Sequence, residues 1–244
     1  MLAPPPETLA VAASYKFDGD FEIGSRSLRL VDIDGSRALE ETGVSVWDAA
    51  LIFAKALGRQ PALLFSGSRG PHPRVLELGS GTGVLGIAAA LLGAEVVLTD
   101  LPALAGLAEQ NVALNAESID AAGGSARFGA LDWQAPDLER FDGQVDVLLA
   151  ADPVWRAEQA PLFAAVVRRV LTANRCRLLL ARSDRTCVHE AAEALFEALA
   201  AEGLEAEALD QAMLDSPELP VSARHFVRHS VVKVWVICPI AADD

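Results

Sequence analysis

The spacing of apolar residues changes partway along the chain and divides it into two parts. In the first part, alternating apolar residues flank Gly24-Ser25, which predicts a β-hairpin within residues 15–33. Helical spacing then runs from Val46 to Leu57, after a Ser45-x-x-Asp48 pattern that is typical of a capping box. We therefore expect a hairpin and one helix before the main fold.

From residue 74 onward, short apolar runs alternate regularly with amphipathic segments. This alternation indicates a mainly parallel sheet with helices on both faces. The expected strands are 74–78, 95–99, 126–129, 145–150, 177–181, 205–209 and 231–238, and the expected helices are 84–92, 102–115, 157–171 and 186–202. The fold class is α/β: a Rossmann-like seven-stranded sheet with antiparallel last strands and the β-hairpin as an accessory element on its rim.

Too little chain precedes residue 74 to build a second core, so we expect one domain over residues 15–244. It comprises the hairpin and helix (15–73) and the seven-strand core (74–244), and residues 1–14, with three successive prolines, are expected to form a flexible tail. The start of the chain lacks the basic and apolar regions of a signal peptide, and its longest apolar stretch is too short to cross a bilayer.

Charge and cysteine content narrow the partners and the compartment. Twenty basic residues against 34 acidic ones give a net charge of −14, which would repel a phosphate backbone and favours a protein partner with a cationic surface. The three scattered cysteines contain no CxxC pair that could hold zinc, so we expect no metal and reduced thiols. We expect a monomer in the cytoplasm, with the nucleus as a second compartment.

Unusual residues collect after the first two strands of the predicted sheet. In open α/β sheets ligands bind beyond the carboxyl ends of the strands, near the point where strand order reverses. The first strand ends in the sequence ELGSGTG (77–83), whose glycines allow the backbone to approach a ligand closely, before a helix whose first amides could bind an anionic group. The second strand ends at Asp100, whose carboxylate could accept both hydroxyls of a ribose.

These features also have other interpretations. Gly81-x-Gly83-x-x-Gly86 satisfies a dinucleotide fingerprint, so an NAD enzyme must be considered, and Asp100 could simply cap a helix. Glu77 lies inside an apolar strand, where its carboxylate must find a donor such as a ligand ammonium. A methionine moiety supplies an ammonium and NAD does not.

The third and fourth strands are followed by Asp132-Trp133 and by the turn ADPVW at residues 151–155. Asp152 could accept hydrogen bonds from an amine, and Trp155 could wall the slot and stabilise cationic charge through its ring face. Alternatively, Asp152 caps the helix beginning near residue 157 and Trp155 packs beneath that helix. Trp133 and Trp47 could equally be core or interface aromatics.

Four motifs carry a resemblance to a known family: VWDAA (46–50), the segment from Val75 to Pro102, the DW pair and AADPVW. Together they resemble the lysine-methyltransferase-like family of class I, seven-β-strand S-adenosylmethionine-dependent methyltransferases, whose members modify chaperones, AAA ATPases and translation elongation factors. The resemblance runs from about residue 44 to 182. It implies S-adenosylmethionine as cofactor, bound by Trp47, Gly79, Ser80, Gly81, Asp100, Trp133 and Ala151, to which we add Glu77. It also places the acceptor motif on Asp152 to Trp155.

In that motif the chain departs from the family, which has Tyr or Phe at the position of Trp155 and usually a β-branched residue at that of Pro153. The turn partly resembles the Asp-Pro-Pro-Tyr turn of enzymes that methylate amino nitrogens on nucleobases and glutamine. The expected function is methylation of a protein lysine, with Asp152 and Trp155 as catalytic residues. The alternatives are an N-methyltransferase acting on a small amine or pyridine, and a non-catalytic cofactor-binding protein.

Overall fold

The computed structural model describes residues 21–31, 42–184, 189–210 and 231–240. The tail predicted at residues 1–14, the outer parts of the predicted hairpin segment and the start of the helix predicted from 186 lie outside the described residues. Two hydrophobic clusters lie on opposite faces of one central sheet, each covered by helices.

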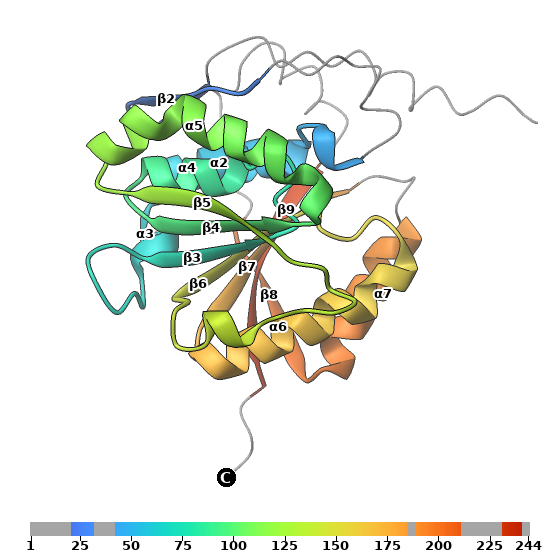
Figure 1. The fold of residues 1–244 in the computed structure, drawn as a ribbon. Helices are drawn as coiled ribbons and strands as arrows, with labels where there is room; N and C mark the ends of the chain where they lie inside the picture. The colour runs from blue at the N-terminus through green and yellow to red at the C-terminus, as the bar shows by residue number, and fades with distance from the viewer. Residues whose placement is uncertain (1–20, 32–41, 185–188, 211–230, 241–244) are drawn as a thin grey trace, which may run out of the picture.

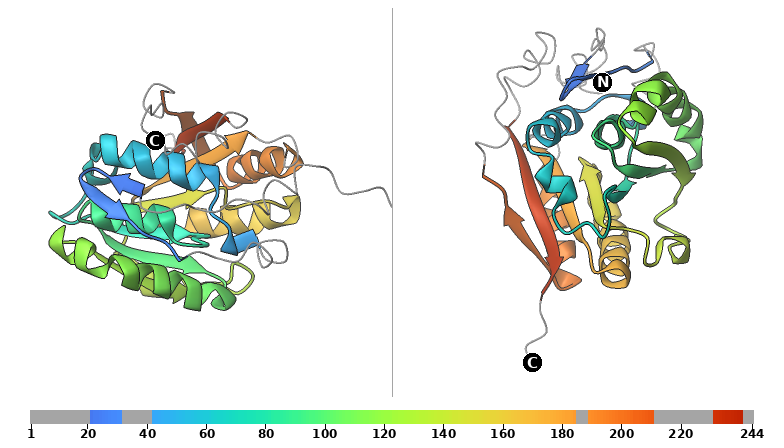
Figure 2. Two further views of the ribbon diagram at one scale, coloured as in Figure 1. Left: turned by 90° about the horizontal axis from the view of Figure 1, so that it is seen from above. Right: turned by 90° about the vertical axis from the view of Figure 1, so that its left-hand side faces the viewer.

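The sheet has seven strands in the order β5-β4-β3-β6-β7-β9-β8, and they confirm the predicted set with small shifts at the ends. Their bounds are β3 Arg74–Leu78, β4 Glu95–Asp100, β5 Ser125–Ala130, β6 Val147–Ala151, β7 Arg177–Asp184, β8 Leu204–Ala208 and β9 Val231–Pro239. The first five are parallel. The last strand, β9, runs antiparallel to β8, as predicted, and also antiparallel to β7. Figure 2 shows β8 and β9 together at one edge.

Helices cover both faces of the sheet (Figure 1). On one face lie α2 (Asp48–Arg59), α4 (Val84–Leu91) and α5 (Ala105–Ala121), with the short α3 (Ala62–Phe65) following α2. On the other face lie α6 (Ala160–Asn174) and α7 (His189–Ala201). The described residues also contain four short 3-10 helices: η1 Thr42–Val44, η2 Pro102–Leu104, η3 Glu139–Phe141 and η4 Ala157–Gln159.

The hairpin forms from β1 (Phe21–Ile23) and β2 (Arg26–Leu28), but it does not sit on the rim of the sheet. It packs on the outer side of the helix layer, against α2, α4 and α5. Two buried asparagines of α5 bind the chain after β2: Asn115 Oδ1 accepts the Arg29 N–H at 2.9 Å and Asn111 Oδ1 accepts the Val31 N–H at 2.8 Å. The backbone N–H groups that follow β2 thus find hydrogen-bond acceptors on α5.

The start of α2 corrects the predicted capping box. The helix begins at Asp48 with Trp47 as its N-cap residue, and no side chain caps it. The Trp47 carbonyl accepts the first helical hydrogen bonds from Ala50 and Leu51, at 3.1 and 3.2 Å. Asp48 is buried as the first residue of the helix, so Ser45 is not the N-cap residue and the predicted box does not form. None of the helices in the described part of the chain is long and apolar enough to cross a membrane.

Candidate active site

The strand order places the predicted site residues on one edge of the sheet. β3 lies between β4 and β6, so the chain moves outward from β3 in both directions and the order reverses there. Parallel pairing brings the carboxyl ends of these three strands, at Leu78, Asp100 and Ala151, to the same edge. A ligand in such a fold binds at this reversal. The glycine loop, Asp100 and the 151–155 turn therefore converge as expected.

The glycine loop after β3 turns through left-handed backbone conformations that favour glycine. Gly79, Gly81 and Gly83 have φ angles of +68°, +52° and +84°. A side chain on Gly81 would also come within 2.9 Å of the Gly43 carbonyl oxygen, because η1 packs directly on the loop. The segment before α2 thus helps to enclose the loop.

Asp100 joins the end of β4 to this loop. Its two carboxylate oxygens accept backbone N–H groups, Oδ2 from Gly81 at 2.8 Å and Oδ1 from Leu101 at 2.7 Å. Burial raises the pKa of Asp100, and these two hydrogen bonds oppose the rise. Each oxygen keeps a lone pair for a further donor. The side chain does not cap η2, whose N-cap residue is Leu101.

Glu77 finds its donor inside the protein. It is 2% exposed, and Oε2 accepts the Gly86 N–H of α4 at 2.9 Å. Burial raises the pKa of Glu77 to about 8; the Gly86 hydrogen bond opposes the rise and the charge of Asp100 adds to it. A Cβ on residue 86 would lie 2.4 Å from Oε2, so the glycine is needed for this approach. The Gly86 amide is therefore not free for an anion, and contact between Glu77 and a ligand ammonium stays a prediction.

Ser80 carries the unsatisfied group of the loop. Its backbone N–H donates to the Thr99 carbonyl at 3.0 Å, and Thr99 Oγ1 donates to the Glu77 carbonyl at 2.5 Å. The Ser80 hydroxyl oxygen is buried and has no hydrogen-bond partner within the described part of the chain. A buried hydroxyl without a partner is costly, so this group suits a polar ligand.

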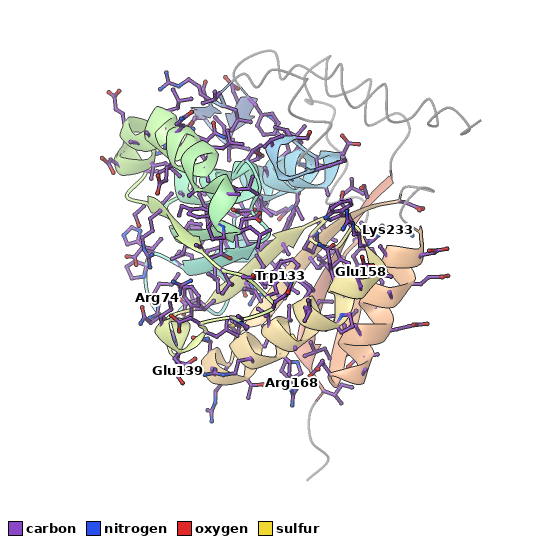
Figure 3. All side chains as sticks on the ribbon, turned by 45° about the vertical axis from the view of Figure 1, so that its right-hand side comes forward. Arg74, Trp133, Glu139, Glu158, Arg168 and Lys233 are labelled. Carbon is purple, nitrogen blue, oxygen red and sulfur yellow. The ribbon has the colours of Figure 1, made fainter. Side chains whose placement is uncertain are left out.

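Two tryptophans predicted to contact the cofactor occupy different positions. Trp133 lies between the strands and α6, where its ring meets Phe163 edge to face at 5.2 Å (Figure 3). A Cβ on Gly79 would be 3.6 Å from the Trp133 ring and from Pro153, so both border the loop. Trp47 is half-buried at the start of α2, and its cofactor contact stays a prediction.

The turn after β6 holds Asp152 in an unusual backbone conformation. Asp152 has φ +46°, and its N–H donates to the Ala181 carbonyl at 3.0 Å. Its carboxylate accepts two hydrogen bonds from Ser183, one from the N–H at 2.9 Å and one from the hydroxyl. Within the described residues the carboxylate therefore binds β7 and not the helix that follows, whose first turn has Arg156 as its N-cap residue, so the capping interpretation is wrong. Sequence reasoning missed Ser183, whose only signal was a polar residue ending an apolar strand.

Trp155 is on the surface. The residue is 41% exposed, so its side chain is not packed beneath the following helix. The Arg156 guanidinium lies over its ring, 4.2 Å from the centroid. Gln159 Oε1 accepts the N–H groups of both residues, at 3.3 and 3.2 Å, which fixes the turn. Arg156 is a second residue that sequence reasoning missed.

The opposite edge of the sheet holds a hollow of about 410 Å³, but its polar groups are already occupied. Asp146, buried there, accepts from Arg69 Nε at 2.6 Å and from Arg74 Nη2 at 3.1 Å. The remaining guanidinium nitrogens bind Asp146 and the carbonyls of Gly143 and Val145. Figure 3 shows Arg74 well away from Trp133. This cluster fastens a loop and leaves few donors for a ligand.

Comparisons with known proteins point to one family. The family model described as lysine methyltransferase matches residues 31–202, which include all the residues discussed above for the site. EEF1A lysine methyltransferase 3 of Mus musculus is 34% identical over 166 residues, 68% of this chain and 66% of that protein. Protein-lysine N-methyltransferase rrg1 of Schizosaccharomyces pombe is 48% identical over 102 residues, 39% of this chain and 34% of that protein. The chain thus spans less than two thirds of the length of these relatives.

Solved structures agree at the level of the fold. Magnesium protoporphyrin IX methyltransferase from Synechocystis with bound SAH has a TM-score of 0.51 and 18% identity, covering 79% of this chain and 85% of that one. The glycopeptide N-methyltransferase MtfA has a TM-score of 0.51 and 12% identity, covering 77% and 95%. Such identities establish a shared architecture only. By the family match over most of its length, the chain belongs to the lysine methyltransferase family.

Proposed function

We propose that this protein is an S-adenosylmethionine-dependent N-methyltransferase that methylates a lysine side chain of a protein substrate. The observation that carries the proposal is the family match over residues 31–202, which contain both the glycine loop with Asp100 and the Asp152 turn on one sheet edge. The names of the relatives in mouse and fission yeast, both lysine methyltransferases, support a protein substrate.

The residues at the edge fit this cofactor. Three glycines in left-handed conformation form a cradle, and the buried Ser80 hydroxyl in this loop has no hydrogen-bond partner among the described residues. Asp100 keeps lone pairs for two hydroxyl groups, and Trp133 offers an aromatic surface beside Gly79. We propose that Trp47, Glu77, Gly79, Ser80, Gly81, Asp100, Trp133 and Ala151 hold the cofactor. When bound, it supplies a methyl group activated by a positively charged sulfur.

The remaining task of the protein is to present a neutral amine. A lysine with a pKa of about 10.4 must lose a proton, which costs roughly 4 kcal/mol near pH 7.4. Asp152 can accept hydrogen bonds from the docked ammonium, because Ser183 occupies only one direction at each of its oxygens. Orientation of the nitrogen toward the methyl group then contributes most of the rate.

Arg156 and Trp155 define the outer wall of the acceptor slot in this proposal. The guanidinium already covers one face of the indole, so a second cation cannot use that face. A positive charge near the docked lysine also disfavours the ammonium form and assists loss of its proton. Trp155 thus acts together with Arg156, where the family motif has Tyr or Phe.

We further propose a cationic surface around the target lysine, because a net charge of −14 attracts such a partner. On the same ground nucleic acid is not a proposed partner, and no membrane association is proposed. The proposed state is a monomeric single domain over residues 15–244 in the cytoplasm, with the nucleus as a second compartment.

Incubation of the protein with tritium-labelled S-adenosylmethionine and a cell lysate tests the function. Labelled protein bands, with label released as methyllysine after acid hydrolysis, are the expected result. Asp100→Ala serves as the control that removes cofactor binding, since its carboxylate lies beside Gly81. Label in small amines alone would replace the proposal by a small-molecule methyltransferase, and no label with normal cofactor binding would indicate a non-catalytic protein.

A further inference from the structure

We infer that Ser183 is a positioning residue that aims the Asp152 carboxylate at the acceptor amine. The inference rests on the proposed function and deepens it. Ser183 lies 31 residues from Asp152 in the sequence, yet within the described residues it donates two hydrogen bonds to that carboxylate. No motif that we identified in the sequence includes it.

Ser183 is held rigidly at the carboxyl end of β7. It is 2% exposed and pairs with Val232 of the antiparallel β9 on one side. On the other side β7 pairs with β6 up to Ala151↔Ala181, and the Asp152 N–H continues that ladder to the Ala181 carbonyl. Ser183 is therefore fixed by the sheet, and Asp152, the first residue of the turn after β6, is tied to the sheet through its N–H.

The carboxylate is anchored at both oxygens. The Ser183 N–H donates to Oδ1 at 2.9 Å and the Ser183 hydroxyl donates to Oδ2. A carboxylate has about four acceptor directions, so each oxygen keeps one for the amine. Hydrogen bonds to both oxygens remove rotation about the last side-chain bond. The free directions are then fixed in space before the substrate arrives, which is the requirement for efficient catalysis.

The backbone of the turn needs this anchor. Asp152 has φ +46°, a left-handed conformation that is unfavourable for a non-glycine residue, and Pro153 follows with its fixed φ. The Pro153 ring and Cα border Gly79 of the glycine loop. Thus the anchored turn also abuts the proposed cofactor site. Residues held in such conformations cluster at active sites when the surroundings over-determine them.

The test compares Ser183→Ala, Ser183→Thr, Asp152→Asn and the double variant Asp152→Asn/Ser183→Ala, with the exposed Ser125→Ala as a matched control. The probes are labelled S-adenosylmethionine with a cell lysate, and with n-butylamine as a stand-in for the lysine side chain. Transfer rates at saturating cofactor are measured together with SAH affinity and melting temperature.

We expect Ser183→Ala to lower the transfer rate about 10-fold to 100-fold, the loss of one hydrogen bond to a charged group, with SAH affinity within about twofold of the wild type. Ser183→Thr, which keeps the hydroxyl, should restore most of the rate. In the Asp152→Asn background the alanine should cost less than about twofold, because Ser183 acts through the carboxylate.

Three results would overturn the inference while leaving the proposed function intact: a wild-type rate for Ser183→Ala, an equal loss in the presence and absence of Asp152, or a loss explained by weaker SAH binding. If the wild type methylates n-butylamine but no protein in the lysate, the proposal of a protein substrate is wrong. The rate ratios measured with n-butylamine would still decide the role of Ser183. A wild type that transfers methyl groups to neither probe would overturn both.

Discussion

Replacing Glu77 by glutamine should change how the stability of the protein depends on pH. The carboxylate is 2% exposed and has its hydrogen bond from the Gly86 N–H at 2.9 Å. Burial raises its pKa from 4.5 to about 8, against the opposing effect of the Gly86 bond and with a contribution from the charge of Asp100. Glutamine keeps an oxygen that can accept the Gly86 N–H and cannot ionise.

The sign follows from proton binding in the two states. Between pH 4.5 and 8 the native protein holds a proton on Glu77 that the unfolded chain has released, so the free energy of unfolding falls as pH rises. The stabilisation that comes from this raised pKa is fully present below pH 4.5 and is lost as the pH approaches 8. At 1.36 kcal/mol per pKa unit, the wild type should lose roughly 3–4 kcal/mol relative to the variant between pH 5 and 8. The buried amide adds a cost of about 1–3 kcal/mol that does not depend on pH.

Urea unfolding of the wild type and Glu77→Gln at several values between pH 5 and 8 measures this difference. The exposed Glu109 of α5 provides the matched control, because Glu109→Gln removes the same charge without a burial effect. We expect the curve for Glu77→Gln alone to diverge from the wild type as pH rises. A constant difference between wild type and Glu77→Gln across this range would refute the argument from burial.

The same residue offers a test of its place in the cofactor site. At pH 7 a carboxyl group with a pKa of about 8 is mostly protonated, and an ammonium bound beside it would lower that pKa and release the proton. Calorimetry of SAH binding in buffers of different ionisation enthalpy should therefore detect release of up to about one proton by the wild type and less by Glu77→Gln. If both proteins release the same number of protons, Glu77 does not contact the ligand ammonium and only holds the start of α4 through Gly86.

Three further substitutions have separable effects. Asp100→Ala should weaken SAH binding about 100-fold in calorimetry, because hydroxyl groups lose two acceptors. Asp152→Asn should lower turnover on the order of 10²-fold, about 2.7 kcal/mol of transition-state stabilisation, with SAH affinity nearly unchanged. Asp146→Asn should destabilise the fold by about 2 kcal/mol in urea unfolding, since it removes the charge of a buried carboxylate that accepts hydrogen bonds from two partly exposed arginines.

Each of these predictions has a clear counter-result. Unchanged SAH affinity in Asp100→Ala, or tight NAD binding by the wild type, would reject the assignment of the loop. Methyl transfer at the wild-type rate by Asp152→Asn would reduce that carboxylate to an anchor of the turn. Burial alone would raise the pKa of Asp146, but hydrogen bonds from Arg74 and Arg69 lower it to about 2. Its stabilisation should thus fade as pH falls from 3.8 toward 2, and a wild type insensitive to that change would contradict the role of the cluster.

The sequence alone was sufficient for the elements and for the edge that carries the chemistry. Apart from β5 the parallel strands are short apolar runs, and apart from the fully buried α4 the long helices have a polar face, so residue spacing identifies most of them without knowledge of their partners. Once the strands are parallel, their carboxyl ends share an edge, and the residues after them must gather there. The glycine loop and Asp100 are local signals of this kind, because a tight turn restricts which residue types fit.

Tertiary structure alone decided the partners of the polar side chains. Glu77 binds a backbone N–H on the next helix, and Ser183 anchors Asp152 from a neighbouring strand. The Ser45-to-Asp48 pattern is typical of a capping box, yet the helix begins only at Asp48, with Trp47 as its N-cap residue. The physical reason is that a hydrogen bond joins two groups at about 3 Å, and the register of strands and the docking of helices determine which distant groups reach that separation.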